Sequence, residues 1–183
     1  MDKRIIKIRK LVQKKFDKED WQYHMLPMIE NALQLARIYK INRDIVELAA
    51  LLHDIGRAEK GDDAEHHIVG VPIAKKILKK FNYDQKIINK IEHCIESHRS
   101  LRGPKPRTIL AKIIANADAM AHFDVLPVLI YYRGKKHNFE ETIKWVRKKI
   151  ERNWRKKITL PKAKKLIEKK YFAFKLLLKD LDL

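Results

Sequence analysis

The sequence predicts an all-α protein, a helical bundle followed by additional basic helices near the C-terminus. Two observations lead to this fold class. Apolar residues recur at the three- and four-residue spacing of an amphipathic helix along almost the whole chain, and few stretches alternate polar and apolar residues as a half-buried strand would. The length of 183 residues, 45% of them hydrophobic, fits one domain with a continuous core. We therefore expect a single domain over residues 1–183.

Five helices are expected in the first half of the chain, each with an apolar stripe. Pro27 restricts where the second can begin, because proline is tolerated only in the first turn of a helix, and this puts His24 at the helix start or at a kink. Asn42 is the expected N-cap of the third helix and Gly56 its expected end, followed by a polar loop over residues 57–63. The expected helices cover about residues 3–16, 22–39, 42–56, 64–81 and 85–98.

The helical pattern continues beyond a basic loop at residues 99–107, whose prolines stop any helix. The next helix, expected at about residues 108–122, is rich in alanine. Small side chains let neighbouring backbones come close together. This environment suits a buried carboxylate at Asp118.

The last third of the chain is also expected to be helical. Residues 125–132 have a strand-like composition, but Asp124 as an N-cap and Pro127 in the first turn favour a further helix. Two long basic helices, at about residues 139–157 and 161–180, complete the chain. We expect their aromatic side chains to pack on the same core as the preceding helices.

The formal net charge of +19 is unevenly distributed, because residues 133–183 hold 18 Lys and Arg against 6 Asp and Glu. Such a region attracts anions, including phosphorylated small molecules, nucleic acid and acidic lipid, without specifying the partner. Nucleic-acid binding by the C-terminal helices is one interpretation. A solvated lysine-rich surface, as in thermophilic proteins, is the alternative that we favour.

The N-terminus does not resemble a secretory signal, since charged and apolar residues alternate closely over residues 1–7. No run approaches the roughly 20 apolar residues that a membrane span needs. The single cysteine, Cys94, cannot form an internal disulfide, which suits a reducing compartment. We therefore expect a soluble, cytoplasmic protein without a membrane partner.

Some ionisable residues fall in apolar surroundings on different expected helices, namely His24, His53, Asp54 and Asp118. A buried ionised carboxylate costs several kcal/mol unless it is paired or bound to a metal, and imidazole together with carboxylate suits divalent ions. Taken singly, each residue has an ordinary interpretation: His24 as a capping group, for example, or Asp118 as the partner of Arg57. Taken together, they predict a metal site.

The order of these residues resembles the HD-domain superfamily of metal-dependent phosphohydrolases, which is defined by a His, a His-Asp doublet and a later Asp in an all-helical domain. The doublet here reads His53-Asp-Ile-Gly56. His66-His-Ile-Val-Gly70 is similar to the family's His-x-x-x-Gly segment, and Ile95-Glu-Ser-His98-Arg99 to its Ile-x-x-His-Arg segment. The resemblance covers about residues 20–124 and implies an HD-like metal-binding core there, with residues 133–183 as basic helices packed on it.

The resemblance implies one divalent metal ion with the ligands His24, His53, Asp54 and Asp118. His66 and His98 match positions that bind a second ion in some branches of the family, with Asp54 then bridging both ions. Ligands of this kind accept manganese, iron, cobalt, nickel or magnesium, so the identity of the metal and the choice between one and two ions stay open.

The other histidines are interpreted as lying outside the metal site. His67 competes with His66 for the second ion, and His66 is preferred because it has the His-x-x-x-Gly spacing. His93 lies five residues before His98, about 140° away around a helix, so the two do not reach one centre. We interpret His122 and His137 as ordinary side chains.

A bound divalent ion lowers the pKa of water toward about 7 and withdraws charge from a phosphoryl oxygen. The sequence therefore predicts a metal-dependent phosphohydrolase, a phosphomonoesterase or phosphodiesterase, acting on a small phosphorylated substrate such as a nucleotide. The predicted catalytic residues are Asp54, Arg57 and His98. The predicted substrate-binding residues are Arg57, Lys60, Arg99 and Arg102. For Arg57, a surface position favoured by the helix dipole is the alternative.

The sequence departs from particular branches of the family. Residues 53–58 read His-Asp-Ile-Gly-Arg-Ala, without the acidic pair of the stringent-response hydrolases, so hydrolysis of guanosine polyphosphates is not expected. The Gly-Tyr-Pro motif of the cyclic dinucleotide phosphodiesterases is missing, and Ala121 stands where many members have a further Asp. Two other functions stay open: a di-iron oxygenase of the same fold, and a non-enzymatic nucleic-acid-binding protein with a degenerate site.

Overall fold

The computed structural model describes residues 2–60, 65–99 and 103–179, except for the side chain of Lys60. These residues form helices and loops without any strand, which confirms the all-α prediction. The helices and two π-helical turns, η1 and η2, are α1 (Lys3–Gln13), α2 (Lys18–Asp20), η1 (Trp21–Met25), α3 (Leu26–Ile38), α4 (Arg43–Leu52), α5 (Ile55–Lys60), α6 (His66–Lys80), α7 (Gln85–Ser97), α8 (Ile109–Asp124), α9 (Leu126–Gly134), α10 (Phe139–Arg152), η2 (Asn153–Lys157) and α11 (Pro161–Leu177).

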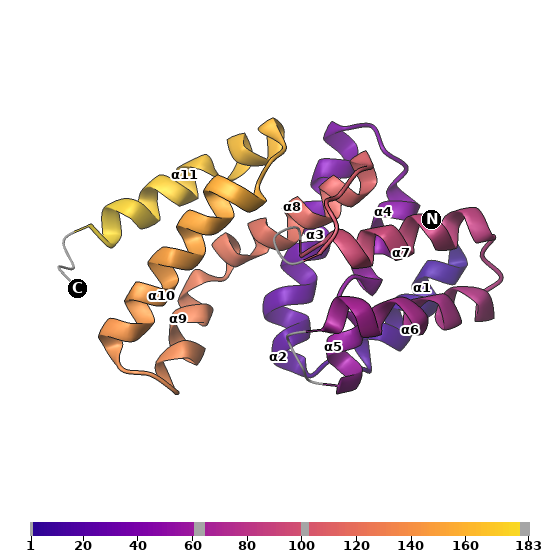
Figure 1. The fold of residues 1–183 in the computed structure, drawn as a ribbon, viewed down its shortest axis with the longest axis horizontal. Coiled ribbons are helices and arrows are strands. Elements are labelled where there is room, and N and C mark those ends of the chain that lie inside the picture. The colour runs from indigo at the N-terminus through magenta and orange to yellow at the C-terminus, as the bar shows by residue number, and fades with distance from the viewer. Residues whose placement is uncertain (1, 61–64, 100–102, 180–183) are drawn as a thin grey trace.

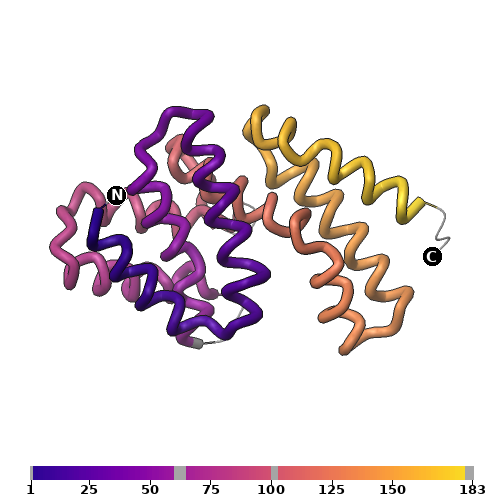
Figure 2. Tube along the Cα trace, turned by 180° about the vertical axis from the view of Figure 1, so that it is seen from behind, coloured from indigo at the N-terminus to yellow at the C-terminus, as the bar shows by residue number. Residues whose placement is uncertain are grey.

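Helix α8 lies at the centre of the molecule, with α1 to α7 on one side and α9 to α11 on the other (Figure 1, Figure 2). Twelve of its 16 residues are buried, so it is covered on nearly every face, as a core helix must be. Buried side chains of the basic helices, such as Val146 and Ile167, belong to the same hydrophobic cluster as Leu48 and Ile113. The C-terminal helices therefore share the core of the rest of the chain.

His24 lies in the π-helical turn η1, directly before α3. Pro27 follows in the first turn of α3. A proline has no N–H to donate to the carbonyl of residue 23, and its ring crowds that carbonyl, so the regular α-helical pattern is interrupted at this point. The position agrees with the predicted helix start or kink, and the wider π turn offsets His24 from the regular face of α3.

The prediction that the third helix ends at Gly56 is wrong. Asn42 caps α4 as predicted, since its Oδ1 accepts hydrogen bonds from the backbone N–H groups of Asp44 at 2.9 Å and Ile45 at 3.2 Å. However, α4 ends at Leu52 and Gly56 lies inside a new helix, α5. Part of the predicted loop over residues 57–63 is thus helical, up to residue 60, and its remainder lies outside the described residues.

Gly56 is required for close packing rather than for helix termination. A Cβ atom at this position would lie 2.1 Å from the carbonyl oxygen of His66 and 2.7 Å from the backbone nitrogen of Gly70. Glycine therefore allows α5 to lie directly against the backbone of α6. This contact sets the distance between the turn that carries Asp54 and the helix that carries His66.

The prediction of a further helix after residue 124 is correct, but the predicted N-cap is wrong. Asp124 is the last residue of α8, and α9 begins at Leu126 with Pro127 in its first turn. The Asp124 carboxylate instead accepts a hydrogen bond from Asn31 Nδ2 at 2.6 Å and pairs with Lys170. Asp124 therefore links α8 to α3 and α11, because its side chain contacts these two helices instead of capping the backbone of α9.

The connection between η2 and α11 is fixed to α8 by the buried side chain of Asn116. Its Oδ1 accepts hydrogen bonds from the backbone N–H groups of Thr159 at 2.8 Å and Leu160 at 3.0 Å. Its Nδ2 donates to the carbonyl of Lys112 at 2.8 Å. Asn116 therefore anchors the C-terminal helices two residues before Asp118.

No single helix among the described residues is long and apolar enough to cross a membrane. Helices α8 and α9 reach that length only as a pair with a bend of 71° between them, and the apolar residues of α8 are buried in the core.

Candidate metal centre

Asp54 lies at the centre of the predicted site, in the short turn between α4 and α5, and is 3% exposed. Its Oδ2 atom lies 3.0 Å from His24 Nε2 and 3.5 Å from His53 Nε2. The guanidinium of Arg57, one turn further on, donates to the same oxygen at 3.2 Å. One carboxylate oxygen therefore faces two imidazoles from two different segments.

The other carboxylate oxygen of Asp54 faces a second pair of imidazoles. Oδ1 lies 3.1 Å from His66 Nε2 on α6 and 3.3 Å from His98 Nε2, at the end of α7. These two Nε2 atoms are 3.0 Å apart. The Asp54 carboxylate thus lies between two groups of histidines, one on each oxygen.

Asp118 joins the first group from the buried helix α8. Its Oδ1 lies 3.8 Å from His24 Nε2, and its Oδ2 accepts a hydrogen bond from Lys157 Nζ at 3.3 Å. Lys157 is therefore its cationic partner, and Arg57 pairs with Asp54 instead. Burial lowers the pKa of His24, but the hydrogen bond to Asp54 and the charges of both carboxylates outweigh burial and raise it.

The hydrogen bonds of two imidazoles leave nitrogen lone pairs directed into the site. A carbonyl oxygen only accepts, so His53 Nδ1–H donates to Ala50 O at 2.8 Å and His98 Nδ1–H donates to Ile95 O at 2.7 Å. Each Nε2 therefore carries a lone pair. His53 Nε2 and Asp54 Oδ1 are both buried without a hydrogen-bond partner. Backbone carbonyls orient metal-bound histidines in this way in many proteins.

The pKa values of the central residues agree with a cation site. Burial lowers the pKa of His53 to about 4, so this imidazole is neutral near pH 7. Burial by itself would raise the pKa of Asp54, but the surrounding histidines outweigh it and hold this pKa well below its usual range. The pKa of Asp118 is held low in the same way, mainly by Lys157. Neutral imidazole and ionised carboxylate are the forms that bind divalent metals.

The chemistry of these donors fits a divalent metal ion. Converging lone pairs and carboxylate oxygens with too few protons between them repel one another unless a cation lies among them. Within the described residues, donor atoms that lie within 4.8 Å of one another form three groups. The groups are His24, His53 and Asp54; Asp54, His66 and His98; and His24, Asp118 and His122.

The third group contains His122, which was interpreted from the sequence as an ordinary side chain. It lines the same cavity as His24 and Asp118. The buried amide of Asn153 donates from Nδ2 to Ala119 O at 3.3 Å and to His122 Nδ1 at 3.2 Å. This assigns the ring proton of neutral His122 to Nε2, so His122 offers a hydrogen-bond donor rather than a lone pair. Burial lowers the pKa of His122 and keeps it neutral.

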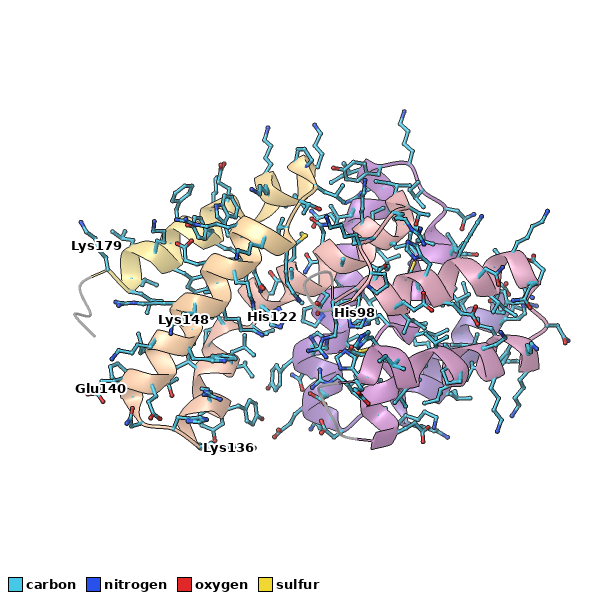
Figure 3. The ribbon with its side chains drawn as sticks, in the orientation of Figure 1. His98, His122, Lys136, Glu140, Lys148 and Lys179 are labelled. Carbon is cyan, nitrogen blue, oxygen red and sulfur yellow. The ribbon has the colours of Figure 1, made fainter. Side chains whose placement is uncertain are left out.

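A cavity of about 400 Å³ opens above the His and Asp cluster. Cationic residues of the C-terminal helices, Lys149, Arg152 and Lys157, line one part of it. Acidic residues of and before α2, Asp17, Glu19 and Asp20, line another. Figure 3 labels His98 and His122, which both line this cavity, near the middle of the molecule. A larger cavity of about 690 Å³ between α1, α4 and α7 contains none of the cluster residues.

The predicted substrate-binding residues are only partly described. Arg57 and Arg99 line the cavity, and the Arg57 side chain is 30% exposed with its charge directed at Asp54. Arg102 and the side chain of Lys60 lie outside the described residues. The sequence analysis did not single out Lys149, Arg152 or Lys157, because Lys and Arg are too frequent in this region to stand out.

The positions of the other histidines agree with their exclusion from the centre. His66, and not His67, contacts Asp54, as the preferred spacing implied. His93 accepts a hydrogen bond from the Arg107 backbone N–H at 3.1 Å, on the far side of α7 from His98. His137 pairs with Glu141 on α10.

The structure is a helical bundle in which buried imidazoles and carboxylates converge from separate helices. This arrangement is typical of one class of helical proteins, those with a metal site inside the bundle. The sequence profile of the HD domain matches residues 21–122, more than half of the chain and including His24, His53, Asp54 and Asp118. The protein therefore belongs to the HD-domain family.

Two solved structures share this fold. A predicted HD superfamily hydrolase from an uncultured Thermotogales bacterium aligns with a TM-score of 0.66 at 23% identity, over 96% of this chain and 90% of that one. Bacillus subtilis YpgQ, in complex with ADP, aligns with a TM-score of 0.71 at 19% identity, over 98% of this chain and 94% of that one. The alignments include the C-terminal helices, so the described part of the chain shares the fold of these two proteins, with α9 to α11 included.

Two relatives are similar in sequence. A tRNA (cytidine(56)-2'-O)-methyltransferase of Picrophilus torridus is 33% identical over 111 residues, which are 55% of this chain and 31% of that protein. An uncharacterized protein of Methanocaldococcus jannaschii is 28% identical over 146 residues, 71% of this chain and 77% of that protein. The chain thus matches less than a third of the length of the methyltransferase.

Proposed function

We propose that the protein is a metal-dependent phosphohydrolase that hydrolyses a small phosphorylated substrate, a nucleotide. The observation that carries the proposal is the cavity itself, which is lined both by the His and Asp cluster and by cationic side chains. Hydrolysis of a phosphate ester needs both sets of residues, because the ester bond must lie close to the reacting water and the negative charge of the phosphate must be neutralised. The ADP bound to YpgQ, a protein of the same fold, supports a nucleotide as the substrate.

The residues of the cluster have distinct roles in this proposal. The first ion would be held by His24, His53, Asp54 and Asp118, and a second by Asp54, His66 and His98. A divalent metal bound here supplies a water of lowered pKa and withdraws charge from the phosphoryl oxygen. Asp54 is central because its two oxygens face both groups of histidines.

The cationic residues around the cavity would bind and orient the phosphate. Arg57 lies in α5, one turn after Asp54, so its guanidinium is held beside the cluster. Lys157 lies beside Asp118. Two further cations, Lys149 and Arg152, lie on α10, the helix that precedes Lys157 in the chain. The Nε2–H group of His122 would donate a further hydrogen bond to a phosphate oxygen, because its Nδ1 is turned toward Asn153. These groups fix the phosphate before the bond is broken.

Replacement of Arg57 by alanine is expected to lower kcat/KM for a phosphate ester by about 100-fold, as the loss of a charge-stabilising donor does in other enzymes. The affinity for metal should change much less, because Arg57 contacts Asp54 without being a ligand. Steady-state kinetics and metal titration measure the two effects separately. Arg155→Ala is the matched control, since the Arg155 side chain is 71% exposed and pairs with Glu151. An unchanged rate for Arg57→Ala would contradict its role.

The two groups of histidines on Asp54 predict two ions per chain. Elemental analysis of the metal-loaded protein is expected to give close to two ions, and His66→Ala or His98→Ala close to one. His93→Ala is the control, because His93 binds the Arg107 backbone outside the cluster and its loss should leave the number unchanged. A value of one ion in the unaltered protein would remove the second site.

The proposed function is tested by a panel of nucleotides, assayed for phosphate release with manganese, cobalt, nickel or magnesium under anaerobic conditions. Metal-dependent phosphate release is the expected result. An iron-loaded protein that consumes oxygen and releases no phosphate would instead identify a di-iron oxygenase of the same fold, and would contradict the proposal.

Nucleic-acid binding by the C-terminal helices is a second candidate function. Its support is the excess of Lys and Arg in residues 133–183 and the similarity to a protein named as a tRNA methyltransferase. A His53→Ala variant that binds RNA tightly, with an affinity that falls steeply as salt rises, would favour this function over hydrolysis. Weak binding of RNA by both the variant and the unaltered protein would exclude it.

A further inference from the structure

A shallow aromatic trough of about 280 Å³ adjoins the cavity above the metal centre. Its walls are Tyr23, Pro127, Val128, Tyr131 and Tyr132. Tyr23, Val128 and Tyr132 also line the cavity itself, so the two spaces lie side by side and share one wall. A ligand whose phosphate lies among the cationic residues can therefore extend directly into the trough.

We propose that this trough binds the base of the nucleotide substrate, an inference that rests on the proposed hydrolysis of a nucleotide at the neighbouring metal centre. Among the described residues, the walls of the trough are aromatic rings and aliphatic side chains, and none of them belongs to a metal-ligand group. Flat aromatic surfaces of this kind bind bases by stacking, which tolerates any base because every base has a π-face.

The trough is built from two segments, one of which also carries a candidate metal ligand. Tyr23 directly precedes His24 in η1, so the turn that supplies the ligand also supplies one wall. Tyr132 lies near the end of α9, and the carboxylate of Glu19 on α2 raises the pKa of Tyr132 to about 12.

Tyr131 completes the trough with a ring that the protein covers only in part. It is 59% exposed, and its ring meets that of Tyr132 at 5.3 Å with an interplanar angle of 72°. Lys135 lies over both rings, 4.5 Å from the centroid of Tyr131 and 5.1 Å from that of Tyr132. An aromatic side chain exposed to this extent beside a candidate active site is available to a ligand.

The charges around the cavity set the direction in which a nucleotide lies. The wall next to Tyr23 carries carboxylates, including those of Glu19 and Asp20, which repel phosphate. The wall formed by α10 and η2 carries cations, including Arg152 and Lys157, which attract it. The phosphate therefore lies toward the C-terminal helices and the Asp54 cluster, and the base lies toward the tyrosines.

The proposal is tested by the affinity of the metal-loaded protein for adenosine, measured by calorimetric titration. Adenosine has no phosphate ester to hydrolyse, so the readout does not depend on activity. Tyr131→Ala and Tyr132→Ala are expected to weaken adenosine binding by about 10-fold each, as the loss of a stacking partner does elsewhere. Tyr132→Phe keeps the ring and is expected to restore most of the affinity. Phe139→Ala is the matched control, because Phe139 is also 59% exposed but does not line the trough.

A kinetic comparison separates this inference from the proposed function. In both alanine variants KM for adenosine 5'-monophosphate should rise about 10-fold more than KM for ribose 5-phosphate, which has no base. Equal effects on the two substrates, or adenosine binding that is unchanged in the tyrosine variants, would overturn the trough as the base site while hydrolysis stands. Adenosine binding that depends on the tyrosines in a protein without phosphatase activity would support the trough and contradict the proposed hydrolysis.

Discussion

Replacement of Asp54 by alanine is expected to abolish tight metal binding and to lower phosphate-ester hydrolysis by at least about 1,000-fold. The loss is large because one carboxylate serves both groups of histidines, with His24 and His53 on one oxygen and His66 and His98 on the other. Metal affinity should fall by more than about 100-fold, since even changes behind the ligands cost 10- to 100-fold. The rate falls further because the metal supplies several kcal/mol of transition-state stabilisation.

The Asp54→Ala variant is expected to keep its helical content, because Asp54 lies in a turn and the surrounding core is apolar. Calorimetric metal titration and circular dichroism measure the two properties on the same sample. Glu141→Ala is a suitable control, since Glu141 is an exposed carboxylate on α10 that pairs only with His137 among the described ion pairs. Full metal occupancy in the Asp54 variant would refute its assignment as the shared ligand.

Replacement of Gly56 by alanine is expected to destabilise the protein by about 3 kcal/mol, at the upper end of the range for overpacked sites. The added Cβ would lie 2.1 Å from the backbone oxygen of His66, and a backbone atom cannot move aside as a flexible side chain can. A loss of this size lowers the Tm of a protein of this length by roughly 10 °C. Thermal and urea unfolding both measure it.

The same replacement at Gly134 provides the matched control. Apart from the local backbone, no described atom lies within 4 Å of a Cβ placed there, so Gly134→Ala should change stability by less than about 1 kcal/mol, in the stabilising direction. Gly56→Ala should also reduce the number of bound ions, because α6 must move and carry His66 away from Asp54. Equal stabilities of the two variants would show that α5 and α6 separate at little cost.

The sequence predicted the helices well wherever local signals decide the structure. The spacing of apolar residues and the cap at Asn42 correctly placed α4, and Pro127 correctly indicated the first turn of α9. Gly56 and Asp124 were misjudged for a common reason. Glycine after an apolar run ends many helices and Asp before a proline caps many others, but here both residues are used for contacts with distant segments. Local patterns do not contain that information.

The convergence of the candidate metal ligands could be expected from the order of His24, the His53-Asp54 doublet and Asp118, although nothing in their spacing fixes the distances. The position of His122 beside the candidate site could also have been predicted from the sequence. It lies four residues after Asp118 and so shares one face of α8 with it. A histidine one turn from a predicted ligand is a candidate for the same site.

The cationic side of the cavity could not be predicted from the sequence. Lys149, Arg152 and Lys157 are three among 18 basic residues in the last part of the chain, and no spacing distinguishes them from the rest. Their position follows from the packing of α10 and η2 on α8, which depends on buried side chains such as Val146 and Asn153. Figure 3 shows another lysine of the C-terminal region, Lys179 beyond the end of α11, lying away from His122.

The final helices, which are anchored to α8 through Asn116, contribute different groups to the cavity from those that the earlier helices contribute. Every candidate metal ligand precedes residue 124, whereas three of the cationic side chains that line the cavity, Lys149, Arg152 and Lys157, follow it. The candidate metal ligands and these three cations are therefore encoded in separate stretches of the gene, and Asn116, two positions before Asp118, is one of the residues that connect them. We expect substitutions of Lys149 or Arg152 to change which anion is recognised while the candidate metal ligands keep their positions.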